Sequence, residues 1–154
     1  MKKLYTILFL AALMVSACDH AAKTEQTLVT GWYHVVDSET GVERQLGDSL
    51  TYYLDPQPVI TAAHFKAATT ESFPHDSTLW QVVVHLDDTG RERFARATDE
   101  LIGEDLVFVL DDSLWTEPIR IQAKIPNGVI VINKWQFSKE EAEELIGKID
   151  VGKR

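Results

Sequence analysis

The stretch that decides the fold is residues 79–121, LWQVVVHLDDTGRERFARATDELIGEDLVFVLDDSLWTEPIRI. Residues 80–86 are apolar on both faces, which predicts a strand in the middle of a sheet. Asp87 and Asp88 supply a cap and negative charge at the positive end of a helix. The apolar stripe predicted for this helix consists of Phe94, Ala97, Leu101 and Ile102.

The second half of the stretch predicts a strand and a turn. Gly103 ends the helix, since glycine takes positive φ at a helix C-terminus. Residues 106–110 form a continuously apolar strand, and residues 111–113 (DDS) turn it. Pro118 confines the next segment to a sheet edge or a strand start.

The residues before this stretch predict short strands and a helix. Residues 29–37 and 51–54 are rich in aromatic and β-branched side chains, which favours strands, and residues 42–46 are expected to pair back as a second arm. Thr61 is placed to cap a helix. Residues 71–78 are expected to form a polar loop. The predicted helix contains Ala62, Phe65, Ala68 and Thr69 on one face.

The residues after it predict a hairpin and a final helix. Residues 119–125 alternate as a half-buried strand, and Asn127-Gly128 predicts a hairpin to residues 129–133. Ser138 and Glu141 match a capping box. The apolar face of this helix is Ala142, Leu145, Ile146 and Ile149. The chain is therefore expected to be α+β, a two-layer sandwich with a mixed or antiparallel sheet and helices on one face.

The N-terminus predicts export and lipidation. Lys2 and Lys3 precede an apolar run at residues 4–15 that is shorter than the roughly 20 residues of a membrane span. The run ends in Val15-Ser16-Ala17-Cys18, which is similar to a bacterial lipobox, in which the cysteine thiol accepts a diacylglyceryl group. The alternative is an ordinary secretory peptide cleaved after Ala17. The lipobox predicts lipid attachment at Cys18, in the bacterial cell envelope, with inner or outer membrane left open.

Composition narrows the possible partners. Cys18 is the only cysteine, so its acylation leaves no thiol for disulfides or thiolate metal sites. Removing residues 1–17, with two lysines, takes the formal net charge from −9 to −11. Such an acidic protein is repelled by nucleic acid and by anionic lipid head groups. We therefore expect no nucleic-acid partner, and membrane contact through the lipid on Cys18.

A set of short motifs in order along residues 58–149 points to a known family. They are Val59-Ile60-Thr61, Val82-Val83-Val84-His85-Leu86-Asp87, Gly90, Phe94, Ala97-Thr98, Ile102-Gly103, Leu106-Val107-Phe108-Val109-Leu110-Asp111, Glu117-Pro118-Ile119, Ile130, Phe137-Ser138 and Glu140-Glu141-Ala142. In this order the chain resembles the head subdomain in the first periplasmic domain of SecD and SecDF, translocase subunits of bacterial protein export.

The resemblance implies a ferredoxin-like α+β head and contact with polypeptide. Together with the lipobox, it divides the chain into a signal peptide (1–17), a lipidated tether (18–28), accessory strands (29–57) and a head-like domain (58–150). In the family, proton coupling belongs to membrane-spanning helices, which residues 18–154 of this chain do not contain. The motor function is therefore not carried over.

The side chains that could support catalysis have simpler explanations. The five histidines are His20, His34, His64, His75 and His85, and none are at metal-ligand spacing. His34 and His85 would meet only if their strands were neighbours. The pairs Asp87-Asp88 and Asp111-Asp112 fit a cap and a turn, and Ser138 fits a cap. We predict no catalytic residue, no metal and no cofactor.

The tryptophans remain as possible binding residues. Trp80 and Trp135 are expected in the core, and Trp32 is intermediate. Trp115 is either partly exposed, as binding tryptophans are, or folded over the sheet edge, and we favour the second. The expected function is a non-enzymatic, lipid-anchored envelope protein that contacts polypeptide or an envelope protein complex. The alternative is a small-ligand or ion-binding lipoprotein, or a hydrolase, that uses His34 and His85.

Overall fold

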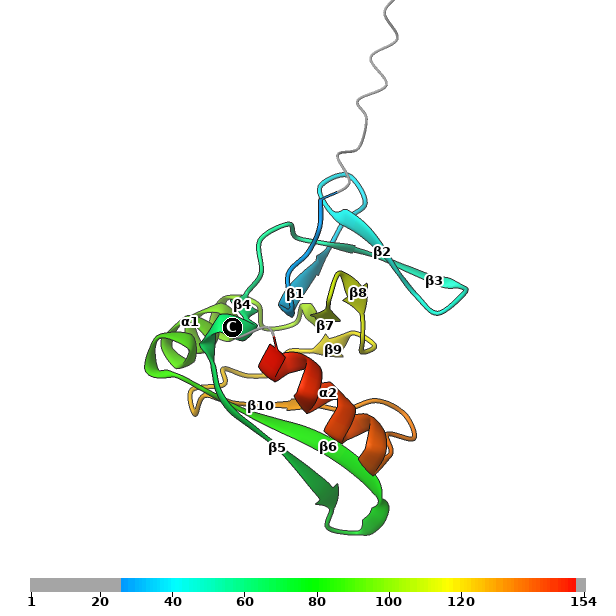
Figure 1. Cartoon of the computed structure of the whole chain (residues 1–154). Helices are drawn as coiled ribbons and strands as arrows, with labels where there is room; N and C mark the ends of the chain where they lie inside the picture. The colour runs from blue at the N-terminus through cyan, green and yellow to red at the C-terminus, as the bar shows by residue number, and fades with distance from the viewer. Residues whose placement is uncertain (1–25, 152–154) are drawn as a thin grey trace, which may run out of the picture.

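The computed structural model describes residues 26–151, and within them the chain is α+β, with two antiparallel sheets and two α-helices (Figure 1). The predicted signal peptide (1–17) and the lipid attachment at Cys18 lie outside the described residues. Within the described range, no helix has both the length and the apolar character needed to cross a membrane.

The predicted single sheet is divided into two. The larger sheet has the order β2-β3-β1-β7-β8, with β4 on β1 and β9 on β7. Its strands are β1 (Gly31–Val36), β2 (Val42–Leu46), β3 (Leu50–Leu54), β4 (Ile60–Thr61), β7 (Asp105–Leu110), β8 (Ser113–Leu114) and β9 (Ile119–Arg120). The smaller sheet has the order β10-β6-β5, with β10 (Val129–Ile132), β6 (Asp76–Leu86) and β5 (Phe65–Phe73).

Strand β7 is buried on both faces, as its continuous apolar run predicts. Leu106, Phe108 and Leu110 belong to the main core, which also includes residues of both sheets and both helices. Val107 and Val109 face a second, smaller core with Tyr33 and Leu54. Strand β1 pairs with both β3 and β7, so this part of the segment 29–57 is integral to the sheet.

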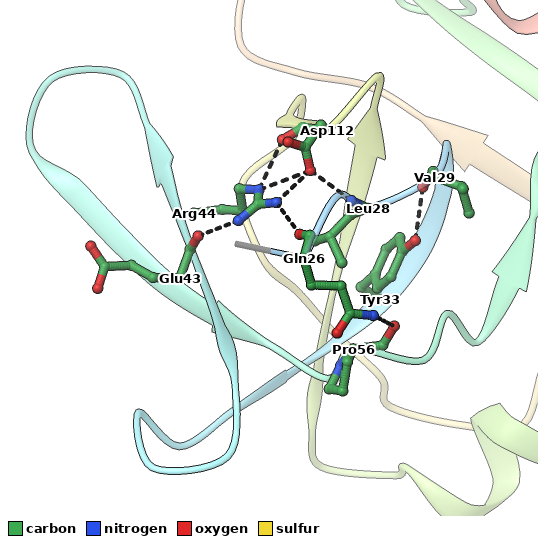
Figure 2. A network of polar contacts seen from close by, with 8 residues as sticks. All are labelled: Gln26, Leu28, Val29, Tyr33, Glu43, Arg44, Pro56 and Asp112. Carbon is green, nitrogen blue, oxygen red and sulfur yellow. Dashed lines mark hydrogen bonds and ion pairs between the residues drawn. The ribbon is translucent and has the colours of Figure 1, made fainter. Parts of the chain in front are cut away.

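A polar clamp holds the first described residues over the smaller core (Figure 2). Arg44 in β2 pairs with the Asp112 carboxylate and donates a hydrogen bond of 2.6 Å to the Gln26 carbonyl oxygen. The same carboxylate accepts a hydrogen bond of 2.6 Å from the backbone N–H of Leu28. The Tyr33 hydroxyl donates to the Val29 carbonyl at 2.8 Å. We call Arg44, Asp112 and Gln26 the N-terminal clamp.

Helix α1 (Asp88–Glu100) begins as predicted, with Asp87 accepting a hydrogen bond of 2.6 Å from the N–H of Gly90. Its buried side is different from the predicted stripe. Phe94 is buried, but Ile102 lies beyond the helix and is 52% exposed. Thr98 is buried on this side of the helix instead. Its hydroxyl accepts a hydrogen bond of 3.0 Å from the N–H of Ile125.

The predicted helix after Thr61 was wrong. Only a short 3-10 turn, η1 (Ala62–His64), is present, and Thr61 makes no side-chain cap. Residues 65–73 form the strand β5 instead, and Pro74 lies in a tight turn to β6, where a polar loop was expected. Long-range pairing with β6 decided this, because Ala68 and Thr69 fit the half-buried edge of a sheet as well as one side of a helix.

The predicted hairpin at Asn127-Gly128 was also wrong. Gly128 does adopt a positive φ of 69°, but β10 pairs with β6 and not with the segment before the turn. The strand predicted for residues 119–125 is present only as the two-residue β9, although the apolar and polar residues alternate along the whole segment. A second arm pairs back as expected, although β2 pairs with β3 and not with β1.

Helix α2 (Lys139–Val151) packs across β5 and β6 (Figure 1). Its buried face contains Ala142, Leu145 and Ile149, as predicted, with Ile146 partly buried. The capping box is present: Glu141 accepts from the N–H of Ser138 at 3.0 Å, and Ser138 accepts from the N–H of Glu141 at 3.2 Å.

Candidate functional site

A hollow of about 680 Å³ lies between the β2–β3 hairpin and the segments that follow β8 and β10. We call it the aromatic hollow, because two tryptophans line it. Its lining residues are Leu46, Gly47, Leu50, Trp115, Glu117, Pro118, Ile119, Asn133, Lys134 and Trp135.

Trp135 is the most exposed large apolar side chain of the hollow. It was expected in the core, but its relative exposure is 86%. It lies in a turn between β10 and α2, and the next residue, Gln136, has a positive φ of 54°. Positive φ is uncommon for a residue with a side chain, and such conformations are concentrated at binding and active sites. The turn therefore presents an indole to solvent, beside the exposed apolar side chains of Leu50 and Ile119 that also line the hollow.

Trp115 forms the inner wall of the hollow. It is half-buried: one part of the side chain packs against the main core and another lines the hollow. Its backbone N–H donates a hydrogen bond of 2.9 Å to the Phe108 carbonyl, which fixes the residue beside β7. Its indole Nε1 is buried and has no hydrogen-bond partner among residues 26–151.

Lys134 directly precedes Trp135 in the chain, and its ammonium group contacts both an aromatic ring and a carboxylate. Its Nζ is 4.9 Å from the centre of the Trp115 ring, within the range of a cation–π interaction. The same Nζ donates a hydrogen bond of 2.6 Å to Glu141 in α2. This hydrogen bond, followed by that from the Ser138 N–H, lowers the pKa of Glu141 below its ordinary value. The wall of the hollow is thereby linked to the capping box of α2.

The rim of the hollow is apolar and exposed. Leu50 is 46% exposed and Ile119 is 38% exposed. Gly47, in the turn between β2 and β3, also lines the hollow and has a positive φ of 63°. Glu117 and Asn133 add a carboxylate and an amide at the margin. Large apolar groups with a few polar groups at the edge are suited to holding side chains of another polypeptide.

The sequence missed most of this hollow. Trp115 was singled out, but Leu46, Leu50 and Ile119 come from segments far apart in the chain that only folding brings together. One local signal was available. Trp135 lies between a strand and a helix cap, where the chain must turn, and loop residues are generally exposed.

The two histidines of the alternative hypothesis are in different sheets. His34 is in β1 of the larger sheet and His85 is in β6 of the smaller one. His34 Nε2 is 3.8 Å from Glu104, and His85 is exposed. Neither histidine lines the aromatic hollow or the second hollow of about 630 Å³ beside Asp111 and Asp112. The structure therefore does not bring them together.

The remaining candidates have structural partners. Asp87 caps α1 and lies 3.3 Å from His64 Nδ1, and the Gly90 N–H is the main cause of its lowered pKa. Burial raises the pKa of Asp112, but the Leu28 N–H and Arg44 outweigh it and the pKa is lowered overall. Within residues 26–151, no three histidine, cysteine, aspartate or glutamate side chains are grouped as metal ligands.

Comparisons with known proteins agree on one family. Residues 34–153 match the model of the SecDF P1 head subdomain, a wider span than the 58–149 on which the resemblance was based. A structure of SecDF, described as a membrane component that enhances protein export, superposes with a TM-score of 0.63 at 23% identity, covering 81% of this chain and 63% of that one. No curated protein matches the chain.

A second solved structure, SecDF in a super-membrane-facing form, gives a TM-score of 0.64 at 20% identity. The match covers 81% of this chain but 19% of that one. The chain thus spans less than two thirds of the length of these solved structures. At these identities the superpositions establish the fold of the head and nothing further.

Proposed function

Because the chain belongs to the family of SecDF P1 head subdomains, we propose that it is a non-enzymatic cell-envelope protein that contacts polypeptide through the aromatic hollow. The single observation that carries this proposal is Trp135, an indole that is 86% exposed on the rim of an apolar hollow. Tryptophan is one of the three residue types enriched among those that dominate binding energy at interfaces.

The chemistry of the hollow favours a polypeptide partner over other classes. Its rim residues Leu50 and Ile119 offer contact area to apolar side chains, which nucleic acid lacks. The formal net charge of −9 opposes binding to phosphate backbones and to anionic lipids. Lys134 is already neutralised by Glu141, so the hollow does not add a strong positive centre.

We also propose that the protein is held at a membrane by lipid on Cys18. The lipobox at residues 15–18 supports this anchor, and the apolar run before it supports export. A related solved structure is described as a membrane component that enhances protein export, which supports a location in the cell envelope.

The proposal of a non-enzymatic role is supported by the side chains available in the hollow. A hydrolase needs a nucleophile or an activated water with a base within hydrogen-bond reach. The lining residues Glu117 and Lys134 are the ionisable ones, and Lys134 is committed to Glu141. The distribution of His34 and His85 over two sheets gives no support to the alternative site.

The test is binding of an unfolded polypeptide to the purified full chain. The probe is a reduced and carboxymethylated protein carrying a fluorophore, and the readout is fluorescence anisotropy. We expect Trp135→Ala to weaken binding about tenfold or more, the effect of losing a dominant interface tryptophan. The matched control is Ile102→Ala, which removes an apolar side chain that is 52% exposed outside the hollow.

Cross-linking in native membranes extends the test to the partner. A photoreactive amino acid at position 135 should form adducts with a protein of the envelope, whereas the same group at position 102 should not. Equal binding by wild type and Trp135→Ala, with identical cross-linking at both positions, would disprove a role for the hollow.

A further inference from the structure

The outer edge of β5 is a second feature suited to contact with polypeptide. Strand β5 has nine residues and is the outer strand of the smaller sheet, where it pairs with β6 on one side. In Figure 1 the β5–β6 hairpin extends from the body of the molecule at the end away from the β2–β3 hairpin. An edge strand of this length leaves a row of backbone groups available for pairing.

Two hydrogen bonds of β6 show which groups of β5 face outward. The N–H of Leu86 donates to the Gly128 carbonyl at 2.8 Å, and the N–H of Trp80 donates to the Phe137 carbonyl at 2.9 Å. The even-numbered residues of β6 thus direct their backbone groups toward β10, because these directions alternate along a strand.

The odd-numbered residues of β6 therefore direct their backbone groups toward β5. Among them, His85 is opposite Ala67 and Val83 is opposite Thr69. It follows that the N–H and C=O groups of Ala68 and Thr70 are directed away from β6, toward the open edge.

The middle of this edge lacks the features that usually block pairing. Natural edge strands are protected by lysine, proline or a bulge. In β5 these lie at the ends: Lys66 is at a register shift, and Pro74 follows the strand. Between them, the exposed side chains of Ala67 and Thr69 are small and uncharged, and Glu71 is the charged residue of this stretch. An approaching backbone would meet little steric resistance at Ala67 and Thr69.

We propose that the open edge of β5 binds an extended segment of polypeptide as an added β-strand, with Ala68 and Thr70 supplying the backbone hydrogen bonds. This deepens the proposed function and rests on it, since it describes how the same polypeptide is held. A backbone is the occupant that the geometry selects, because its donors and acceptors repeat at the spacing of the edge. Because the side chains of Ala67 and Thr69 are small, they should discriminate little between the side chains of a bound segment, so segments of varied sequence could bind.

The test uses a peptide of the same length as β5 with alternating valine and threonine and a lysine at each end. A second version is methylated on alternate backbone nitrogens, which removes one row of donors and leaves the side chains unchanged. We expect the methylated peptide to bind the full chain about tenfold more weakly than the unmethylated one. Isothermal titration calorimetry measures both affinities.

Variants of the protein provide the reciprocal test. Thr70→Pro removes an outward N–H that β6 does not use, so the sheet should be retained and the melting temperature should stay near that of wild type. We expect it to weaken peptide binding about tenfold, whereas Thr70→Ala, which keeps the N–H, should bind as wild type does.

The outcomes separate this inference from the proposed function. Equal affinity for the two peptides would overturn the β5 edge even if Thr70→Pro failed to fold. If Trp135→Ala lost the unfolded polypeptide while both peptides bound equally, the hollow would stand and the edge would not. A dimer that Thr70→Pro abolishes, without peptide binding, would assign the edge to a second copy and overturn the inference. Failure of wild type to bind either probe would remove both proposals.

Discussion

Lys134 donates a hydrogen bond of 2.6 Å to Glu141, and this contact joins the aromatic hollow to the start of α2. Glu141 also accepts from the Ser138 N–H at 3.0 Å, so one carboxylate serves both the helix cap and the wall of the hollow. The Lys134 ammonium in turn lies 4.9 Å from the centre of the Trp115 ring. The geometry of the hollow therefore depends on the cap.

We expect Glu141→Gln to make stability less dependent on acid pH. The folded-state pKa of Glu141 is lowered from its ordinary value of 4.5, so its ionised form stabilises the fold. This contribution is complete well above pH 4.5 and is lost as the pH falls below that value, toward the folded-state pKa. Urea unfolding of wild type and Glu141→Gln should thus differ most near neutral pH and converge in acid.

Glu140→Gln is the matched control for this titration, because Glu140 is an exposed neighbour in the same first turn of α2. Because Glu140 is exposed, this substitution should change the free energy of unfolding by less than about 0.5 kcal/mol. A Glu141→Gln difference that grew in acid would contradict the assigned sign.

Removing the cap should also be costly. Ser138→Ala removes the hydroxyl that accepts a hydrogen bond of 3.2 Å from the Glu141 N–H. We expect the free energy of unfolding to fall by about 1 kcal/mol, the typical value for an N-cap serine. Ser138→Asp, which restores an acceptor, should recover most of the loss in the same urea titration. Equal stability of Ser138→Ala and wild type would show that the cap contributes nothing.

Phe94→Ala should be among the most destabilising substitutions in the chain. Phe94 is 2% exposed within the main core, and its truncation leaves a cavity. We expect a loss of about 3–5 kcal/mol in the free energy of unfolding. Ile102→Ala, at a position 52% exposed, should change stability by less than about 0.5 kcal/mol. Similar losses for the two variants would mean that the buried side of α1 is misassigned.

Arg44→Ala should release the N-terminal segment from the sheet. Arg44 contacts both Asp112 and the Gln26 carbonyl, and hydrogen bonds to charged groups contribute about 1.5–3 kcal/mol. We expect faster amide hydrogen exchange at Leu28, whose N–H donates to Asp112. Arg96→Ala, at an exposed position of α1, should leave that exchange rate unchanged. Unchanged exchange in Arg44→Ala would argue against the clamp.

Trp135→Ala should leave stability nearly unchanged while it weakens polypeptide binding. An indole that is 86% exposed buries little surface in the free protein, so its removal should change the free energy of unfolding by less than about 0.5 kcal/mol. Thermal unfolding followed by circular dichroism measures this. A large loss of stability would place Trp135 in the structural core, as the sequence first predicted.

Elements specified by local chemistry were predicted well. The cap at Asp87, the turn at Asp111-Asp112 and the capping box at Ser138 each depend on residues within a few positions of one another. Asp111 and Asp112 both adopt positive φ, as a two-residue hairpin turn requires. These features satisfy backbone donors locally, so the sequence alone contains the needed information.

Elements specified by distant pairing were predicted poorly. Residues 65–73 are compatible with a helix or a strand, and only pairing with β6 selects the strand. Gly128 signals a turn correctly, but a turn does not state which strand its neighbours will join, and β10 joins β6. The aromatic hollow was missed for the same reason, since Leu50, Trp115 and Trp135 come from three separate segments.

The sequence by itself determined the α+β class, the apolar strands 80–86 and 106–110 and the first residues of both helices at their N-caps. Only the tertiary structure decided the division into two sheets, the exposure of Trp135 and the open edge of β5. The physical reason is range. Caps and turns are stabilised by contacts between residues a few positions apart. Strand partners and surface hollows depend on contacts between residues far apart in the chain, and a local sequence pattern does not show which distant residues will meet.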